Sequence, residues 1–196
     1  MMFAQYILYG VDLCSRPIGT ELRLVVDTIV DDRMIELYTK ALKNPFLVPA
    51  SPVDDPRRHL MEMKKQRDSG EGIPFSKIYL GNYLIGIGFS RKLSDKAVKL
   101  YRLNDRLDWY RIGWWYIDEE LQGKGYGVQA MKLFIEKYKN VFYMAEVGNI
   151  GSQKVAMKAG MRHYGSVWVD EQSDIYREQQ NFDDREFYIY KTEESK

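Results

Sequence analysis

The alternation of hydrophobic and polar residues divides the first part of the chain into short strands and two helices. Alternating apolar and β-branched side chains predict strands, and apolar residues that recur every three or four positions predict helices. Asp31 or Asp32 can cap the first helix, and Gly81-Asn82 marks a hairpin turn. The predicted elements are a strand at 20–26, a helix at 31–43, a loop with four prolines at 45–56, a charged helix at 57–67, and strands at 75–81, 83–93 and 109–117.

The later part of the chain alternates between strand and helix. Apolar residues recur at helical spacing over 125–138, and the run at 141–147 is typical of a buried strand. The remaining predicted elements are a short helix at 152–159 that Gly160 closes and two strands at 162–169 and 185–191 with a polar loop between them. An antiparallel meander followed by a parallel crossover predicts the α+β fold class.

The length of 196 residues fits one domain. We expect a single domain over residues 1–196, with an N-terminal extension at 1–19 and a flexible tail at 192–196. The formal net charge of +1 argues against nucleic acid as the main ligand, because no overall field attracts a polyanion. No apolar run approaches the length of about eighteen residues that would predict a membrane-spanning helix.

Cysteine and histidine are too scarce to suggest a disulfide or a metal site. Cys14 is the only cysteine and cannot form an internal disulfide, which fits a reducing cytoplasm. His59 and His163 lie far apart and have no Cys, Asp or Glu at metal-ligand spacing, so we predict no metal.

A glycine-rich segment between the aromatic strand and the next helix has the features of an anion site. Residues 122–127 read Gln-Gly-Lys-Gly-Tyr-Gly, and free backbone N–H groups at a helix start attract phosphate. Gly123, Gly125 and Gly127 would let the backbone approach phosphate oxygens, while Lys124 would add a cation. The spacing matches neither a Walker loop nor a dinucleotide fingerprint. The alternative is a strand-to-helix turn that binds no ligand.

Two motifs in the right order resemble the GNAT superfamily of N-acetyltransferases. The segment 122–127 is similar to its Q/R-x-x-G-x-G/A signature, and 149–161 is similar to its N-x-x-S/A-x-x-(apolar)-x-x-K-x-G-F helix behind the cofactor thiol. Together the motifs cover roughly 112–161. The wording of the first motif and the serine at 152 resemble most closely the branch that modifies ribosomal-protein N-termini.

This resemblance implies a fold and a cofactor site. It implies a mixed central sheet of about six to seven strands, splayed between the fourth and fifth strands and flanked by about four helices. Acetyl-CoA would be the co-substrate, with its pantetheine amides paired to the splayed fourth strand. The cofactor-binding residues that the resemblance implies are Tyr116, Ile117, Gln122, Gly123, Lys124, Gly125, Tyr126, Gly127, Asn149 and Ser152.

Acyl transfer from a thioester to an amine needs a neutral amine, a stabilised tetrahedral oxyanion and a proton for the departing thiolate. Glu146 is the first candidate for the general base, because similar family members place theirs on this strand; the alternative is a solvated strand carboxylate. Ser152 is the second catalytic candidate, as the residue that protonates the sulfur or, alternatively, only as the cap of its helix. Asn149 would orient the acetyl or pantetheine amide.

The chain departs from the family pattern at two catalytic positions. Many relatives have a tyrosine acid where this chain has Ala156 and Met157, and the ribosomal-protein branch has a strand glutamate where Arg111 and Ile112 stand. Catalysis could therefore depend mainly on positioning the amine. The aromatic side chains of the fourth strand are expected to alternate between the core and the acceptor groove.

The sequence thus predicts an acetyl-CoA-dependent N-acetyltransferase in which a primary amine attacks the thioester directly, in a ternary complex. Two alternatives stay open: a catalytically silent acyl-CoA-binding or partner-docking module, and an N-acyltransferase that uses a different acyl-CoA. The acceptor, a small molecule or a protein N-terminus or lysine, is not determined by the fold. Exposed sheet edges often pair, which leaves a homodimer open.

Overall fold

The computed structural model describes residues 21–47, 53–68, 74–169 and 185–192. The expected N-terminal extension, the loop between the last two strands and nearly all of the expected tail lie outside these ranges. The strands are β1 (Leu22–Asp27), β2 (Phe75–Leu80), β3 (Tyr83–Lys92), β4 (Tyr110–Ile117), β5 (Val141–Glu146), β6 (Arg162–Val169) and β7 (Arg185–Lys191). The helices are α1 (Asp32–Ala41), α2 (Pro56–Asp68), α3 (Asp95–Leu100), α4 (Tyr126–Tyr138) and α5 (Ile150–Lys158), with a 3-10 turn, η1 (Glu119–Leu121), after β4.

These strands form one seven-stranded sheet in the order β1-β2-β3-β4-β5-β7-β6. The first four strands are an antiparallel meander, and β4 then pairs with β5 in parallel. That parallel pairing runs only from Tyr110 opposite Val141 to Ile112 opposite Tyr143, after which β4 and β5 are no longer paired. The predicted α+β fold and the splay between the fourth and fifth strands are confirmed.

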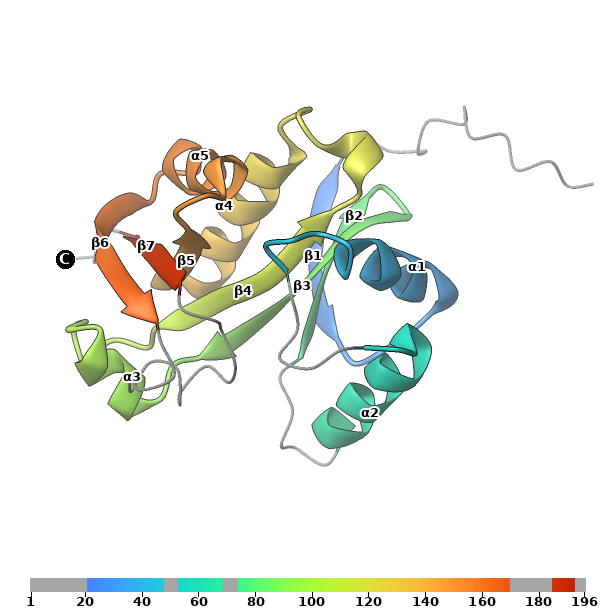
Figure 1. The fold of residues 1–196 in the computed structure, drawn as a ribbon, viewed down its shortest axis with the longest axis horizontal. Coiled ribbons are helices and arrows are strands. Elements are labelled where there is room, and N and C mark those ends of the chain that lie inside the picture. The colour runs from blue at the N-terminus through green and yellow to red at the C-terminus, as the bar shows by residue number, and fades with distance from the viewer. Residues whose placement is uncertain (1–20, 48–52, 69–73, 170–184, 193–196) are drawn as a thin grey trace, which may run out of the picture.

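Helices cover both faces of the sheet (Figure 1). α1 and α2 bury apolar side chains with β2, β3 and β4 on one face, and α4 and α5 pack against β4 and β5 on the other. α3 covers a third cluster, which it forms with Trp109 just before β4 and with residues of β5 and β7. The sequence pattern did not predict α3, because six residues are too few for a helical period to show. Its N-cap is Ser94, which accepts the N–H of Ala97.

A β-bulge in β4 decides which side chains face the two helical layers. Trp114 has a φ of 53°, in the left-handed region, and the register between β3 and β4 shifts opposite Gly88. A Cβ on Gly88 would lie 2.6 Å from the Cβ of Trp115, so this position requires glycine. Ile112 and Trp115 consequently face the same core, although simple alternation would place them on opposite faces.

Candidate functional site

A cavity of about 380 Å³ opens where β4 and β5 separate. The strands form two of its walls, and the first turns of α4 and α5 form a third. The predicted site residues that line it are Tyr116, Ile117, Gln122, Gly123, Gly125, Gly127, Glu146, Asn149 and Ser152. Lys124 is exposed and does not line the cavity, and the ring of Tyr126 packs against the core beneath α4.

The glycines of the loop before α4 have two different roles. Gly123 and Gly125 have φ values of 75° and 86°, and a Cβ built on either would meet no atom within 4 Å. Both positions therefore favour glycine for their backbone conformation and border open space at the start of α4. Gly127 is different, because its Cβ would lie 3.3 Å from the side chain of Val155. Gly127 allows α4 and α5 to approach each other closely, in addition to bordering the cavity.

The start of α4 has the electrostatics of an anion site. Gly125 is the N-cap and has no side chain to accept the N–H groups of the first turn. Those N–H groups and the positive end of the helix dipole therefore remain available to an anion. The side chain of Gln122 donates to the carbonyl of Ile117 over 2.8 Å, which ties the loop back to the end of β4.

Asn149 caps α5, and Ser152 does not. The side chain of Asn149 accepts the backbone N–H of Ser152 over 3.0 Å, and the helix begins at Ile150. The prediction that the helix begins at Ser152 was wrong. The alternative that Ser152 caps this helix was also wrong, because Asn149 is the cap. Serine is itself a preferred cap, so local preference could not separate it from an asparagine three residues earlier. Ser152 lies in the first turn with its side chain at the cavity.

A tyrosine that no motif indicated lies beside Ser152. Tyr143 on β5 is buried and lines the cavity. Its hydroxyl accepts the indole N–H of Trp115 over 3.2 Å. Burial raises the pKa of Tyr143, and hydrogen bonding from Ser152 and Trp115 only partly opposes the effect.

The end of β5 is held by α5. The amide of Gln153 donates to the carbonyl oxygens of Glu146 and Val147, over 3.2 Å and 2.7 Å. Glu146 is half-buried and lines the cavity. The wall on the side of α1 contains residues that the sequence did not single out for the site, including Phe46, Met144 and Phe187.

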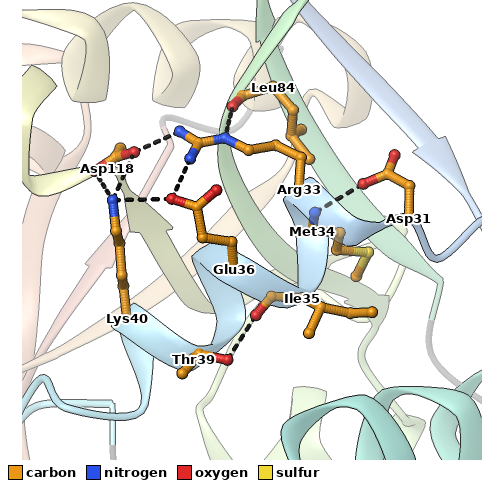
Figure 2. Close-up of polar contacts among 9 residues, drawn as sticks. All are labelled: Asp31, Arg33, Met34, Ile35, Glu36, Thr39, Lys40, Leu84 and Asp118. Carbon is orange, nitrogen blue, oxygen red and sulfur yellow. Dashed lines mark hydrogen bonds and ion pairs between the residues drawn. The ribbon is translucent and has the colours of Figure 1, made fainter. Parts of the chain in front are cut away.

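A partly buried ion cluster fastens α1 to the end of β4 (Figure 2). Asp118 is 3% exposed and directly follows β4. It accepts hydrogen bonds from Arg33 over 2.5 Å and from Lys40 over 3.2 Å, and Glu36 pairs with the same two cations. Arg33 also donates to the carbonyl of Leu84 on β3. The cluster fixes the point at which the chain leaves the splayed strand for the glycine loop.

Ionisation of this cluster couples its stability to pH. Burial opposes the charge of Asp118, but the hydrogen bonds from Arg33 and Lys40 outweigh it and lower the pKa of Asp118 below its ordinary value of 3.8. The hydrogen bond from Arg33 likewise lowers the pKa of Glu36 below 4.5. Because both folded pKa values are depressed, the stabilisation is complete above the ordinary values and is lost as the pH falls below them.

Replacing Asp118 with Asn should lower the free energy of unfolding by about 2 kcal/mol. This loss is smaller than the usual cost of breaking a fully buried ion pair, because Arg33 and Lys40 are partly solvated. Urea denaturation at pH 7 would measure this. The loss should shrink as the pH falls below the ordinary value of 3.8, because the carboxyl is then protonated first in the unfolded chain and, at lower pH, in the folded protein. Asp108→Asn, which breaks the exposed pair with Lys92, is the control and should change little. An equal effect of the two substitutions would contradict the assignment.

Within the described ranges, no three His, Cys, Asp or Glu side chains are grouped as a metal ion would require. None of the described helices is long and apolar enough to cross a membrane.

Comparisons with known proteins agree with this geometry. A family model described as "Acetyltransferase (GNAT) domain" matches residues 31–162. No curated protein matches the sequence significantly.

Solved structures similar to the chain share its fold at low sequence identity. An aminoglycoside N(6')acetyltransferase from Legionella pneumophila has a TM-score of 0.60 and 14% identity, with 87% of this chain and 91% of that chain covered. A Salmonella typhimurium acetyltransferase that modifies the N-terminal serine of ribosomal protein L7/L12 has a TM-score of 0.59 and 15% identity, with coverages of 89% and 96%. YncA of Salmonella typhimurium, solved with its cofactor acetyl-CoA, has a TM-score of 0.55 and 12% identity, with coverages of 89% and 96%.

Proposed function

The chain belongs to the GNAT acetyltransferase family, and we propose that it transfers the acetyl group of acetyl-CoA to a primary amine. One observation supports this proposal most strongly. A glycine-lined helix start, with free N–H groups, opens into the same cavity as the place where two strands separate. The first feature suits a diphosphate and the second suits the amides of an extended pantetheine arm.

The residues present fit acetyl-CoA. A Cβ at Gly123 or Gly125 would project into open space, so the native glycines leave room for phosphate oxygens at the backbone. Beyond Ile112 and Tyr143, the facing edges of β4 and β5 no longer bond to each other. Backbone N–H and C=O groups of β4 along this edge can pair with amides of the ligand. Acetyl-CoA would supply the activated thioester carbonyl.

We propose catalytic roles for two side chains of this protein, Glu146 and Ser152. Glu146, at the cavity, takes one proton from the ammonium form of the acceptor and passes it to water, and the neutral nitrogen then forms the new bond to the acetyl carbon. The C–S bond breaks and its electron pair stays on sulfur, where the Ser152 hydroxyl donates a hydrogen bond. The second proton that the nitrogen must lose also passes through Glu146 to water, which leaves the amide and the coenzyme A thiolate. No covalent enzyme intermediate is needed, and bringing the two reactants together supplies much of the rate.

The acceptor is proposed only as a primary amine. It would enter between the α1 side of the cavity and the end of β5, where Phe46, Phe187 and Glu146 combine apolar surface with one carboxylate. This combination suits an amine with an apolar or extended substituent. Aminoglycosides and protein N-termini, the acceptors of two proteins that share the fold, are candidates because of that likeness.

A coenzyme A release assay tests the proposal. Purified protein is mixed with acetyl-CoA and a panel of amines: a polyamine, an aminoglycoside, a lysine peptide and a peptide with a free N-terminal serine. We expect acetyl-CoA to bind in calorimetry and at least one amine class to release the free thiol. Binding without turnover would favour the catalytically silent module, and turnover only with a longer acyl donor would favour the other acyltransferase. A lack of affinity for any coenzyme A species would contradict the proposal.

A further inference from the structure

Gln153 is a buried polar side chain at a position that the motif over 149–161 leaves unspecified. It lies on α5 directly after Ser152, and only 7% of it is exposed. It does not line the cavity, so it cannot act by touching a ligand there. A buried amide costs free energy unless its N–H groups find acceptors, so the partners of Gln153 show what this residue holds in place.

Both N–H groups of the Gln153 amide are used at the end of β5. Its Nε2 donates to the carbonyl oxygen of Glu146 over 3.2 Å and to that of Val147 over 2.7 Å. An amide nitrogen carries two protons, so these two bonds use all of its donors. The backbone N–H of Asn149 also donates to the carbonyl of Glu146, over 2.8 Å. One side chain of α5 therefore ties down the whole turn from Glu146 to Asn149.

The end of β5 has a strand neighbour on one side only. Pairing with β4 stops at Tyr143. Pairing with β7 continues as far as Glu146, which is opposite Phe187, and Val147 then donates to the carbonyl of Glu186 over 3.0 Å. On the side where the sheet has opened, the hydrogen bonds from Gln153 supply part of the support that a neighbouring strand gives elsewhere.

Gln153 reaches the strand from the face opposite to the Glu146 carboxylate. Successive side chains of a strand point to opposite faces, so Glu146 shares its face with Met144 and not with Ala145. Met144 belongs to the cluster that α3 covers, whereas Ala145 belongs to the core that includes Ala156 of α5. The amide can thus fix the backbone at Glu146 without filling the space in front of the carboxylate.

Resting on the proposed acetyltransferase function, we propose that Gln153 is a positioning residue that holds Glu146 where it takes the proton of the acceptor amine. Proton transfer needs the two heavy atoms within hydrogen-bond reach, and a small displacement of the carboxylate breaks that contact. Ser152 borders the cavity from the same turn of α5. Gln153 therefore fixes the spacing between the proposed base and the serine that faces the sulfur.

Gln153→Met tests this inference, because methionine is similar in length and flexibility but cannot donate to either carbonyl. We expect kcat to fall about tenfold, since the carboxylate is no longer held within reach of the amine. The affinity for coenzyme A should stay unchanged, because the glycine loop and α5 keep their places. Gln153→Asn, whose amide is one methylene too short to reach both carbonyls, should show the same split between kcat and affinity. A wild-type kcat, or equal losses of kcat and affinity, would overturn the inference.

Thr192→Val is a matched control at the other end of the same strand. Thr192 is buried, its hydroxyl oxygen accepts the N–H of Val141 over 3.0 Å at the start of β5, and it does not line the cavity. Valine keeps the shape of the side chain and removes this buried hydrogen bond. The control should lower the melting temperature about as much as Gln153→Met while keeping the wild-type kcat. Equal losses of kcat in the two variants would reduce Gln153 to a structural role.

Combining Gln153→Met with Glu146→Gln shows whether the effect passes through Glu146. The double variant should be no slower than Glu146→Gln alone, because displacing a side chain that is no longer a base costs nothing more. Losses that multiply would overturn the inference.

Amide hydrogen exchange measured by NMR gives a readout that does not depend on turnover. The N–H of Asn149, bonded to the Glu146 carbonyl, should exchange at least about tenfold faster in Gln153→Met than in wild type, and at the wild-type rate in Thr192→Val. Unchanged exchange in Gln153→Met would overturn the inference while leaving the acetyltransferase proposal intact. If wild type bound no coenzyme A species, the proposed function itself would fail and this inference with it.

Discussion

Gly125→Val is expected to lower kcat/KM for acetyl-CoA at least about 100-fold, because the new side chain would occupy the space that we assign to the diphosphate. Gly125 borders the cavity, and a Cβ there projects into open space beside the free N–H groups of α4. Loss of two charge-assisted hydrogen bonds from those groups would account for a change of this size, since each contributes about 1.5–3 kcal/mol. Calorimetric titration with coenzyme A and steady-state kinetics would measure it.

Gly160→Val separates a blocked phosphate site from backbone strain. Gly160 ends α5 with a φ of 96°, in the same left-handed region, and a Cβ there also meets nothing within 4 Å. It does not line the cavity. Both valine variants should lose similar stability, about 1–2 kcal/mol, from placing a β-branched residue at positive φ. Only Gly125→Val should lose affinity for coenzyme A. Equal affinity losses in the two variants would contradict the assignment of a phosphate site to the start of α4.

Glu146→Gln is expected to reduce kcat about 100-fold near neutral pH while leaving acetyl-CoA affinity unchanged. Glutamine keeps the size and hydrogen-bonding shape of the side chain but cannot accept the proton of an ammonium group. The rise in rate toward alkaline pH should also flatten, because no carboxylate is left at this place to take up the proton of the ammonium group. Initial rates between pH 6 and about 9 at saturating acetyl-CoA would show both effects.

Glu186→Gln is the control for that substitution. Glu186 lies on β7, where its carbonyl accepts the N–H of Val147 directly after β5, and it does not line the cavity. Removing its charge changes the local field near the end of β5 without removing a cavity carboxylate. The control should keep the wild-type pH profile. A wild-type profile in Glu146→Gln itself would remove Glu146 as the base and favour catalysis by positioning alone.

Local patterns were sufficient to predict most elements and the general place of the site. Strand and helix periods span a few residues, and the glycine motif is contiguous, so both can be read without knowing the fold. The prediction that the chain opens into an antiparallel meander with a later parallel crossover was confirmed. The assignment of cofactor and catalytic roles to individual residues stays a prediction that the variants above address.

Only the tertiary structure could bring Tyr143, Trp115 and Ser152 together. The three come from different elements, and their meeting depends on the bulge at Trp114, which one unusual φ produces within a run of aromatic residues. An alternation rule assumes a regular strand and therefore places Trp115 on the wrong face.

The same limit applies to the Asp118 cluster and to Gly127. Arg33 and Asp118 are 85 positions apart in the sequence, so nothing local links their charges. Gly127 belongs to the glycine-rich motif at 122–127, yet the side chain closest to it is that of Val155 on another helix. The sequence by itself determined most of the elements and the glycine-rich motif, because both depend on neighbouring residues. The fold decided which distant side chains share the cavity, because strand register and helix packing set those contacts.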